Sequence, residues 1–335
     1  MFSSSQLTGG LSWPKRYAFA QKQAVIGLAF SEIEKTEGKI PDLPTALLYQ
    51  WIGDVERIKR QNLIVNREVE ALAVLLDAND IKYAVVKGQT VASYYERPEL
   101  RTSGDVDFYV PTEDVEKAKA LICNEWHVEM EKGDSPYHYH FEHGGVIYEM
   151  HFKLFRLFQK QRDQYWQKTL NDAMGYRVAI GSTQVATLEP TVHALYVFMH
   201  LYHHLVEVGV GLRQFCDLAM LLKADIDREQ LKKNLGALGM TRAFRASEYI
   251  LKECIGLSDE YLPYEIRAID RWFGRRMLDV VLYRGNMGHY NKRNGWSGMG
   301  HQVESACIKL SHFVKFFWLS PGYHLGWMKN KVKFR

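Results

Sequence analysis

Two aspartates one residue apart, Asp105 and Asp107, are the side chains of this chain best placed to do chemistry. They lie in segment 101–110, where alternating apolar residues predict a β-strand over 105–110. Successive side chains of a strand point to opposite faces, so both carboxylates share one face. Two adjacent carboxylates repel each other unless a cation lies between them. The pair therefore indicates a site for a hard divalent ion such as Mg²⁺, which commonly takes one or two carboxylates together with substrate phosphates.

A glycine turn precedes the aspartates. The apolar segment 81–86 predicts a strand, and Gly88 follows it and opens a short helix predicted over 89–95. A glycine lets the backbone approach a ligand closely, and the free N–H groups at a helix start form an anion site. Lys87, Gly88 and Gln89 are therefore candidates to bind phosphate groups. Phosphoryl or nucleotidyl transfer requires at least a phosphate-binding site beside carboxylates that bind a metal ion.

The two motifs together resemble a known superfamily. Gly88 near a helix start, followed by the run Gly104-Asp105-Val106-Asp107-Phe108, is similar to the signature of the DNA polymerase beta-type nucleotidyltransferases. The Lys87-Gly88 form, with Arg101 three residues before Gly104, resembles the bacterial group labelled only as nucleotidyltransferase family proteins. Where the superfamily motif has Gly-Ser, this chain has Gly88-Gln89. The resemblance adds Arg101 and Gly104 to the nucleotide-binding candidates.

The resemblance implies a reaction and a cofactor. A nucleoside monophosphate would pass from an NTP to an acceptor hydroxyl or other nucleophile, and pyrophosphate would leave. Two Mg²⁺ ions, or Mn²⁺ in their place, would be held by Asp105, Asp107 and a third carboxylate. A sugar, an antibiotic, a protein side chain or an RNA end would each fit as the acceptor. Two alternatives stay open: a non-catalytic relative that binds a nucleotide or a partner protein, and a kinase-like phosphotransferase that uses the same metal cleft.

The third carboxylate is expected on a later strand, as in the superfamily. Segment 146–152 alternates, with Ile147, Glu149 and His151 on one face and apolar residues on the other. A glutamate between apolar neighbours is costly on a half-buried strand unless it faces a wet cleft. Glu149 matches the third position, where it would bind the metal nearer the acceptor and help to deprotonate the acceptor. His151 would orient Glu149 or contact substrate. The alternative is a surface glutamate on an edge strand.

Two cationic side chains accompany these motifs. Arg101 suits a bidentate contact with phosphate, and Lys87 suits a point-charge contact. The alternative is an ion pair with the aspartates themselves, which would hold the loop when no nucleotide is bound. The two interpretations are compatible.

Several histidines suggest metal ligands. His138, His140 and His143 cluster before His151, but no cysteine or suitably spaced acidic residue completes a tetrahedral zinc set. We therefore expect ordinary strand or hairpin histidines.

A histidine-rich helix is predicted over 191–205. It lacks the His-Asp pair of a metal phosphohydrolase, because His203 is followed by a histidine. The resembling group has a similar helix in its C-terminal half, followed by residues that match Arg213 and Asp217 here. By this resemblance His200, Arg213 and Asp217 would line the cleft opposite the metal. Helix capping and interdomain packing are an equal alternative for these residues.

Hydrophobic periodicity divides the chain into three parts. Residues 1–80 predict an N-terminal helical collar. Residues 81–188 predict an α/β nucleotidyltransferase core, in which a small mixed sheet carries helices on one side. Residues 189–335 predict a C-terminal helical domain, so the expected class is α+β. The elements that bear on the fold below include helices over 21–37, 45–78, 263–283 and 303–317, with a break near 62–66 in the second and an irregular loop at 285–300.

Composition narrows the class of protein. A net charge of +4 is too small to indicate a nucleic-acid binder. The four cysteines are widely spaced and match neither a zinc nor a disulfide pattern. The sequence shows no signal peptide and no membrane-length apolar run, so we expect a cytoplasmic protein. The tail segments 313–319 and 327–335 mix aromatics with cations, and we expect the aromatics to be buried on the domain rather than to contact a membrane surface. The sequence leaves the oligomeric state open.

Overall fold

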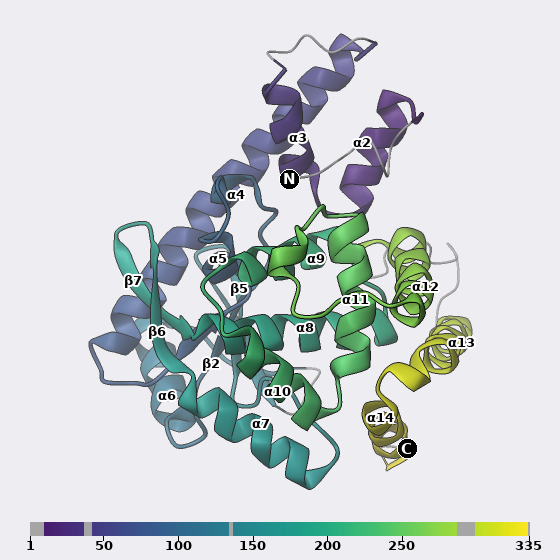
Figure 1. Cartoon of the computed structure of the whole chain (residues 1–335). Coiled ribbons are helices and arrows are strands. Elements are labelled where there is room, and N and C mark those ends of the chain that lie inside the picture. Colours follow the sequence, from purple (N-terminus) through teal and green to yellow (C-terminus); the bar gives the residue numbers. More distant parts are fainter. Residues whose placement is uncertain (1–9, 37–41, 134–136, 287–298, 334–335) are drawn as a thin grey trace.

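The computed structural model describes residues 10–36, 42–133, 137–286 and 299–333. Helices come first, an α/β segment follows, and the chain then becomes helical again (Figure 1), so the predicted α+β class is confirmed. The N-terminal helices are α2 (Trp13–Lys22), α3 (Ile26–Glu34) and α4 (Thr45–Asp77). The α/β segment comprises β1 (Ala84–Val86), α5 (Gly88–Ala92), a 3-10 turn (Pro98–Leu100), β2 (Val106–Tyr109), α6 (Val115–Trp126), β3 (Glu131–Lys132), β4 (His138–His143), β5 (Val146–His151), α7 (Lys160–Asp172), β6 (Met174–Ile180) and β7 (Thr183–Leu188). The C-terminal helices are α8 (Pro190–Glu207), α9 (Leu212–Lys223), α10 (Arg228–Leu238), α11 (Thr241–Glu253), α12 (Ala268–Arg284), α13 (Met299–Phe316) and α14 (Pro321–Lys333). The proposed domain boundaries stay a prediction.

The helix predicted over 21–37 is wrong in its bounds, because the chain breaks between α2 and α3. Gln23 is fully buried there, and its side chain binds two distant segments. Its Nε2 donates to the Val281 carbonyl at 3.2 Å, and its Oε1 accepts from the Leu212 amide at 3.0 Å. Ala24 then adopts a φ of 55°, which turns the chain into α3. The need to satisfy a buried polar group decides the break.

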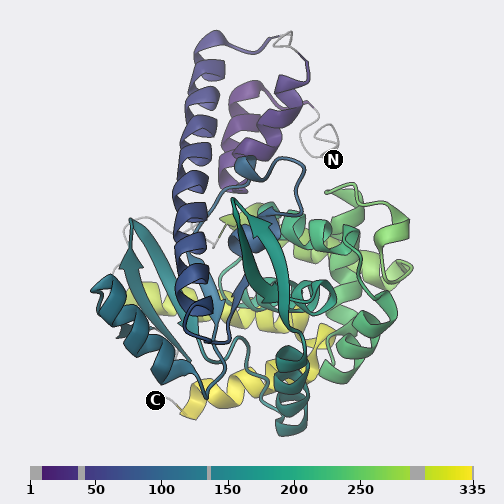
Figure 2. The ribbon, with the colours of Figure 1, turned by 90° about the vertical axis from the view of Figure 1, so that its left-hand side faces the viewer.

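The helix α4 runs without interruption for 33 residues, so the break predicted near Asn62 is wrong. At 1.5 Å per residue it is roughly 50 Å long, and its upper half lies beside α2 and α3 (Figure 2). Trp51 is buried at this contact and donates from Nε1 to the Ile26 carbonyl at 3.1 Å. Asn62 does not interrupt the helix because its side-chain amide donates outward, to the carbonyls of Glu99 at 3.0 Å and Arg101 at 2.8 Å. α4 thereby holds the loop that leads into β2.

Within the described ranges the strands form a five-stranded sheet, in the order β1-β2-β5-β4-β3, and a separate β6-β7 pair. β2 runs antiparallel to β1 and parallel to β5, and the other neighbours are antiparallel. The β4–β5 hairpin turns at Gly144 and Gly145, as predicted, and both adopt positive φ, where a side chain would be strained. The core sheet is therefore mixed, but β6 and β7 do not extend it. They pack on β1 and α4 instead.

Helices cover both faces of the sheet, so the prediction of helices on one side is wrong. Val106 and Phe108 point into a hydrophobic cluster with residues of α4 and α6. Ala84, Val86 and Tyr109 point the other way, into the larger cluster that contains α8. Both faces must be covered because the apolar residues of β1 and β2 occupy both. The face toward α8 is also the face that carries the polar side chains described below.

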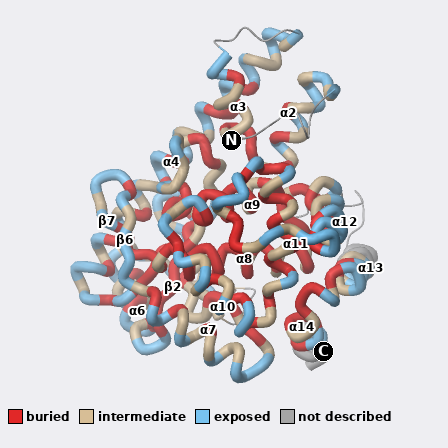
Figure 3. Tube along the Cα trace, in the orientation of Figure 1, coloured by how far each residue is buried: buried red, intermediate tan, exposed pale blue. Residues whose placement is uncertain are grey.

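The helix α8 runs through the centre of the C-terminal half. Its N-terminus is capped by Glu189, whose carboxylate accepts from the amides of Thr191 at 2.9 Å and Val192 at 3.2 Å. Most of its residues are buried, and Figure 3 shows it as a largely red tube. A helix that is apolar on nearly every side is stable only when other elements surround it. α8 is therefore the common support of the helices that follow.

The two helices α12 and α13 can be compared with the predicted helices near the C-terminus. The helix predicted over 263–283 begins only at Ala268, because Asp270 accepts from the Arg267 amide at 3.0 Å and caps the helix there. The helix predicted over 303–317 is present as α13, which begins earlier, at Met299. The expectation that it is the last helix is wrong, because α14 follows it. Most of the loop predicted at 285–300 lies outside the described residues.

Glu248 of α11 is a fully buried carboxyl group, and it generates a prediction about stability. One oxygen accepts from the Tyr264 amide at 2.9 Å, while Oε2 is buried without a partner among the described residues. Burial raises the pKa of Glu248 to about 8. The folded protein thus keeps a proton that the unfolded chain releases near its ordinary pKa of 4.5. The free energy of unfolding therefore falls as the pH rises through this window.

Glu248→Gln removes this penalty because the amide is neutral at every pH. We expect the variant and the wild type to be about equally stable near pH 4.5. Near pH 8 the variant should be more stable by a few kcal/mol, since each unit of pKa difference is worth about 1.4 kcal/mol. Urea unfolding across this range measures the difference. Glu253→Gln, at an exposed position of the same helix, is the control and should show no such trend. A Glu248→Gln difference that does not change with pH would contradict the prediction.

Candidate active site

The parallel pairing of β2 with β5 brings the three predicted carboxylates together. Its register places Asp107 opposite Glu149, and paired residues of adjacent strands share a face. One carboxylate oxygen from each of Asp105, Asp107 and Glu149 lies within 4.8 Å of the other two. A slip of one residue in this register would turn Glu149 to the opposite face. Residues of two separate strand segments thus form one acidic cluster.

Asp107 lies at the buried centre of this cluster and is only 3% exposed. Nζ of Lys87 lies 2.7 Å from its Oδ1, and Nε2 of His151 lies 2.9 Å from the same oxygen. Burial favours a raised pKa for Asp107, but Lys87 and His151 outweigh it and lower the pKa below its ordinary value. Burial likewise favours lower pKa values for Lys87 and His151, and their acidic neighbours reverse this and raise both. Asp107 is therefore held as a carboxylate by the ammonium group of Lys87 and the imidazole of His151.

The two outer carboxylates are in different electrostatic states. The charge of Asp107 raises the pKa of Asp105. Glu149 instead accepts a hydrogen bond from His151, whose Nε2 lies 3.2 Å from Oε2, and this bond lowers the pKa of Glu149 despite burial. Asp105 is thus the carboxylate whose charge is least compensated by the protein.

The oxygen atoms of this cluster fit a hard divalent cation. Mg²⁺ and Mn²⁺ prefer carboxylate oxygens, and three carboxylates lie within reach of a shared ion. The ammonium group of Lys87 already lies against Asp107, so the position attracts positive charge. The raised pKa of Asp105 also indicates a position that favours a cation, because an added positive charge would relieve its repulsion from Asp107. The group can therefore hold a divalent metal ion.

Lys87 reaches Asp107 from an unusual backbone conformation. Its φ is 58° and its ψ is −142°, a region that residues with a Cβ atom rarely occupy. Its amide donates to Nε2 of His193 at 3.1 Å. Its carbonyl accepts from the Val91 amide at 3.1 Å and from the Thr90 hydroxyl at 2.8 Å. These bonds fix the turn between β1 and α5 and aim the lysine at the carboxylates.

The next two residues have different surroundings. Gly88 has a φ of 40° and begins α5. Because Val91 donates to Lys87, the amides of Gly88 and Gln89 precede the first hydrogen bond of this short helix. The Gln89 side chain is buried and donates to the side-chain oxygens of Asn62, at 3.2 Å, and Asn66 in α4. Its side chain therefore anchors α5 to α4, and only its backbone belongs to the turn.

Arg101 pairs with Asp217 of α9, and not with the aspartates of the cluster. Its Nε and Nη2 donate to the two carboxylate oxygens at 2.7 and 2.8 Å, and the Tyr95 hydroxyl donates to Oδ1 at 2.8 Å. Arg101 is 3% exposed and Asp217 is 5% exposed. Burial favours a raised pKa for Asp217, and Arg101 more than offsets it, so the pKa is lowered. This bidentate pair joins the loop before β2 to the C-terminal helices.

A cavity of about 190 Å³ lies between the carboxylates and the C-terminal helices. All of the residues predicted for the site line it, except Gln89 and His151. His151 lies behind the lining, in contact with Asp107 and Glu149. The lining residues that the sequence did not single out for the site are Val91, Val197, Leu201, His204 and Gln214. Helical spacing on α8 could have found Val197, Leu201 and His204, because they lie on one face with His200.

Arg213 of α9 is one of the residues that line the cavity. Its Nη1 donates to the Thr102 carbonyl at 2.8 Å, and its Nε is buried without a partner among the described residues. Burial, followed by the charge of Arg101, lowers the pKa of Arg213. Arg101 occupies both oxygens of Asp217, and Asp217 acts on Arg213 only through its charge. The positive charge left over suits an anionic ligand.

The histidines of α8 divide between the cavity and the core. Nε2 of His200 lies 3.3 Å from Nζ of Lys87, and burial, followed by the charge of Lys87, lowers the pKa of His200 well below its ordinary value. Burial also lowers the pKa of His193 and of His204 to about 3. These imidazoles are therefore neutral. His203 points away, and its Nδ1 lies 2.5 Å from the Tyr323 hydroxyl.

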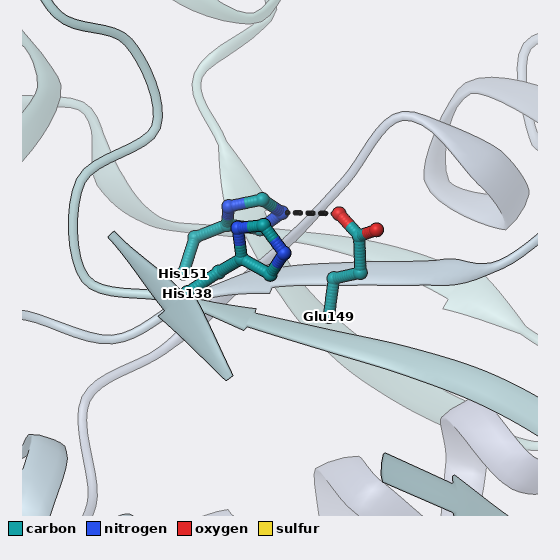
Figure 4. Close-up of side chains that lie close together, drawn as sticks. All are labelled: His138, Glu149 and His151. Carbon is teal, nitrogen blue, oxygen red and sulfur yellow. Dashed lines mark ion pairs between the residues drawn. The ribbon is translucent and has the colours of Figure 1, made fainter. Parts of the chain in front are cut away.

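A second group of side chains lies beside Glu149 on the hairpin. His138 of β4 pairs with His151 of β5. One ligand atom from each of His138, Glu149 and His151 lies within 4.8 Å of the other two (Figure 4). The sequence around His138 places no acidic residue at a spacing suited to a shared metal ion. The pairing of β4 with β5 brings Glu149 close to it.

Comparisons with known proteins identify the family of this chain. The model of a family described as "Uncharacterised nucleotidyltransferase" matches residues 10–256. The chain therefore belongs to this nucleotidyltransferase family. A solved structure of an antigenic nucleotidyltransferase-like protein from Paracoccidioides brasiliensis is similar to 57% of this chain and 95% of that chain, with 16% identity and a TM-score of 0.36. The search of curated proteins found no match.

The C-terminal tail buries part of its aromatic surface. Phe316 and Tyr323 are buried in the larger hydrophobic cluster, whereas Trp318 is 63% exposed. In the part of the chain that the structure describes, no helix has both the length and the apolar character needed to cross a membrane.

The pair of Arg101 with Asp217 generates a stability prediction. Arg101→Met leaves Asp217 buried without its cation, and such a loss costs about 3–5 kcal/mol. The double variant Arg101→Met, Asp217→Leu removes both charges and should recover much of the lost stability, since apolar replacement of a whole buried pair is often neutral. Urea unfolding of the two variants and the wild type measures this. A double variant that is no more stable than Arg101→Met would contradict the prediction.

Proposed function

We propose that this chain transfers a nucleoside monophosphate from an NTP to an acceptor nucleophile and releases pyrophosphate. The observation that carries the proposal is the cluster of Asp105, Asp107 and Glu149 at a cavity that the Gly88 turn also lines. Membership of a nucleotidyltransferase family supports it. The acceptor is a small molecule or a protein group that offers a hydroxyl or another nucleophile. Because its substrate is an NTP, we expect the protein to act in the cytoplasm.

Asp105, Asp107 and Glu149 would hold two Mg²⁺ ions. Bound magnesium supplies neutralisation of charge on the attacking and leaving oxygens. Asp107 is already fixed by Lys87 and His151, so its position does not depend on a ligand. Asp105 has the less compensated charge and gains most from a cation. Because the protein itself compensates Asp107, the site can keep its geometry before a metal ion and substrate bind to Asp105.

The triphosphate would lie along the basic side of the cavity. The Gly88 turn would contribute backbone amides, which precede the first hydrogen bond of α5. Arg213 would donate from its unpartnered Nε. Arg101 holds the loop through Asp217, so in this proposal it positions the phosphate site and does not itself grip the triphosphate.

Glu149 is the proposed proton acceptor. It lines the cavity, and its lowered pKa keeps it ionised, so an oxygen is available to receive a proton from the acceptor hydroxyl. His151 bonds both Glu149 and Asp107. In this proposal His151 orients the glutamate, which is one of the two roles predicted for it.

Asp105→Asn and Asp107→Asn test the proposal. Each variant removes a metal-binding charge, and we expect turnover to fall by about 100-fold or more. The assay incubates the protein, Mg²⁺ and α-labelled ATP, CTP, GTP or UTP with cell extract and follows label in the acceptor. EDTA should abolish transfer. Asp172→Asn, at an exposed position at the end of α7, is the control and should retain full activity.

The position of the label separates the alternatives. Transfer of α-label with release of pyrophosphate supports nucleotidyl transfer. Transfer of γ-label in its place would contradict the proposal and favour a kinase-like phosphotransferase. NTP binding without transfer of either label, unchanged by Asp105→Asn, would favour a non-catalytic binding protein.

A further inference from the structure

The hairpin of β4 and β5 places two imidazoles beside one carboxylate. His138 projects from β4, and Glu149 and His151 project from the same face of β5 (Figure 4). The pairing register puts His138 opposite His151, with ring centroids 5.0 Å apart. Nε2 of His151 lies 3.2 Å from Oε2 of Glu149, the contact drawn as a dashed line in Figure 4. Three potential ligands of a cation thus converge from two adjacent strands.

We propose that His138, Glu149 and His151 bind one nitrogen-preferring divalent cation of the Zn²⁺ class. Zn²⁺ binds imidazole nitrogen and carboxylate oxygen at about 2.0–2.2 Å, so neighbouring ligand atoms of a tetrahedral ion lie roughly 3.3 Å apart. Nε2 of His151 and Oε2 of Glu149 already have this separation at 3.2 Å. A bound zinc ion would replace the proton that Nε2 of His151 shares with Glu149 and Asp107, so the ion and Lys87 together would then compensate the charge of Asp107. All three ligand atoms lie within 4.8 Å of one another, so a small movement of the His138 ring completes the set. Water would take the fourth position, as in other sites with two histidines and one glutamate.

The ligand chemistry separates this site from the carboxylate cluster. Asp105, Asp107 and Glu149 offer oxygen alone, which suits Mg²⁺. The hairpin group offers two nitrogens, and imidazole favours Zn²⁺ and related transition metals over Mg²⁺. Glu149 belongs to both groups and would be a shared ligand. The hairpin ion would therefore lie on the β4 side of Glu149, adjacent to the proposed magnesium site.

A glycine next to His138 makes room for its ring. Gly133 donates from its amide to the His138 carbonyl at 3.1 Å. A Cβ atom built on Gly133 would lie only 1.8 Å from Nε2 of His138. Any other residue would therefore displace the imidazole from the position where it faces Glu149 and His151. Gly133→Ala can thus disturb the site while every proposed ligand is kept.

Metal binding tests this proposal without any assay of activity. The full-length protein is dialysed against limiting Zn²⁺ in a large excess of Mg²⁺, and bound metal is measured by elemental analysis. We expect one zinc per chain in the wild type. His138→Ala should weaken zinc binding at least 10-fold, and Gly133→Ala should weaken it in the same direction. His143→Ala is the matched control on the same strand, because His143 lies on the opposite face of β4 and contacts Glu68, and it should bind zinc as the wild type does.

X-ray absorption at the zinc edge of the wild-type protein provides a measurement that needs no variant. Scattering from two imidazole rings is expected. A shell of oxygen alone, a sulfur ligand, or complete displacement of zinc by Mg²⁺ would overturn the proposal. Zinc binding by His138→Ala that equals the wild type would do the same. Asp105→Asn should retain the hairpin zinc while losing nucleotidyl transfer, so failure of the zinc site and failure of the proposed function are distinguishable.

Discussion

The site depends on one constraint: Asp107 is a carboxylate almost completely removed from water. A buried charge is tolerated only when opposite charge and hydrogen bonds replace its hydration. Lys87 and His151 supply that compensation from two different segments, at 2.7 and 2.9 Å from the same oxygen. The strained turn at Lys87, its amide bond to His193 and the pairing of β5 beside β2 all bring these partners to Asp107. The local geometry of the site follows from the need to neutralise one side chain.

Compensation at Asp107 also explains how charge is distributed around the cavity. The acidic cluster lies on one side, whereas Arg101 and Arg213 lie near Asp217. The imidazoles of α8 between them are neutral because they are buried. A ligand that carries both cations and phosphate groups would complement the two sides together. A metal-bound nucleotide has this pattern of charge, in agreement with the family to which the chain belongs.

Long-range contacts set the frame in which the sheet presents these groups. α4 binds the loop before β2 through Asn62, and its contact with Gln89 anchors α5. The same loop is joined to α9 by the bidentate pair of Arg101 with Asp217. The loop that leads into β2 is thus held from both the N-terminal and the C-terminal helices. Loss of either the Asn62 contacts or the Arg101–Asp217 pair is expected to shift Asp105 and Asp107, although neither contact involves a proposed metal ligand.

The sequence by itself determined the local parts of this site. Alternation along a strand fixes which side chains share a face, so Asp105 and Asp107 could be paired, and a glycine after an apolar strand marked the turn at Gly88. The resemblance to a superfamily then pointed to Glu149 as the third carboxylate. The tertiary structure alone decided which distant groups meet. Arg101 finds Asp217 across 116 residues of chain, Gln23 breaks a helix to reach α9 and α12, and His138 gains Glu149 only through the register of a hairpin. These outcomes depend on the balance of burial and pairing between remote segments, which no local pattern of residues contains.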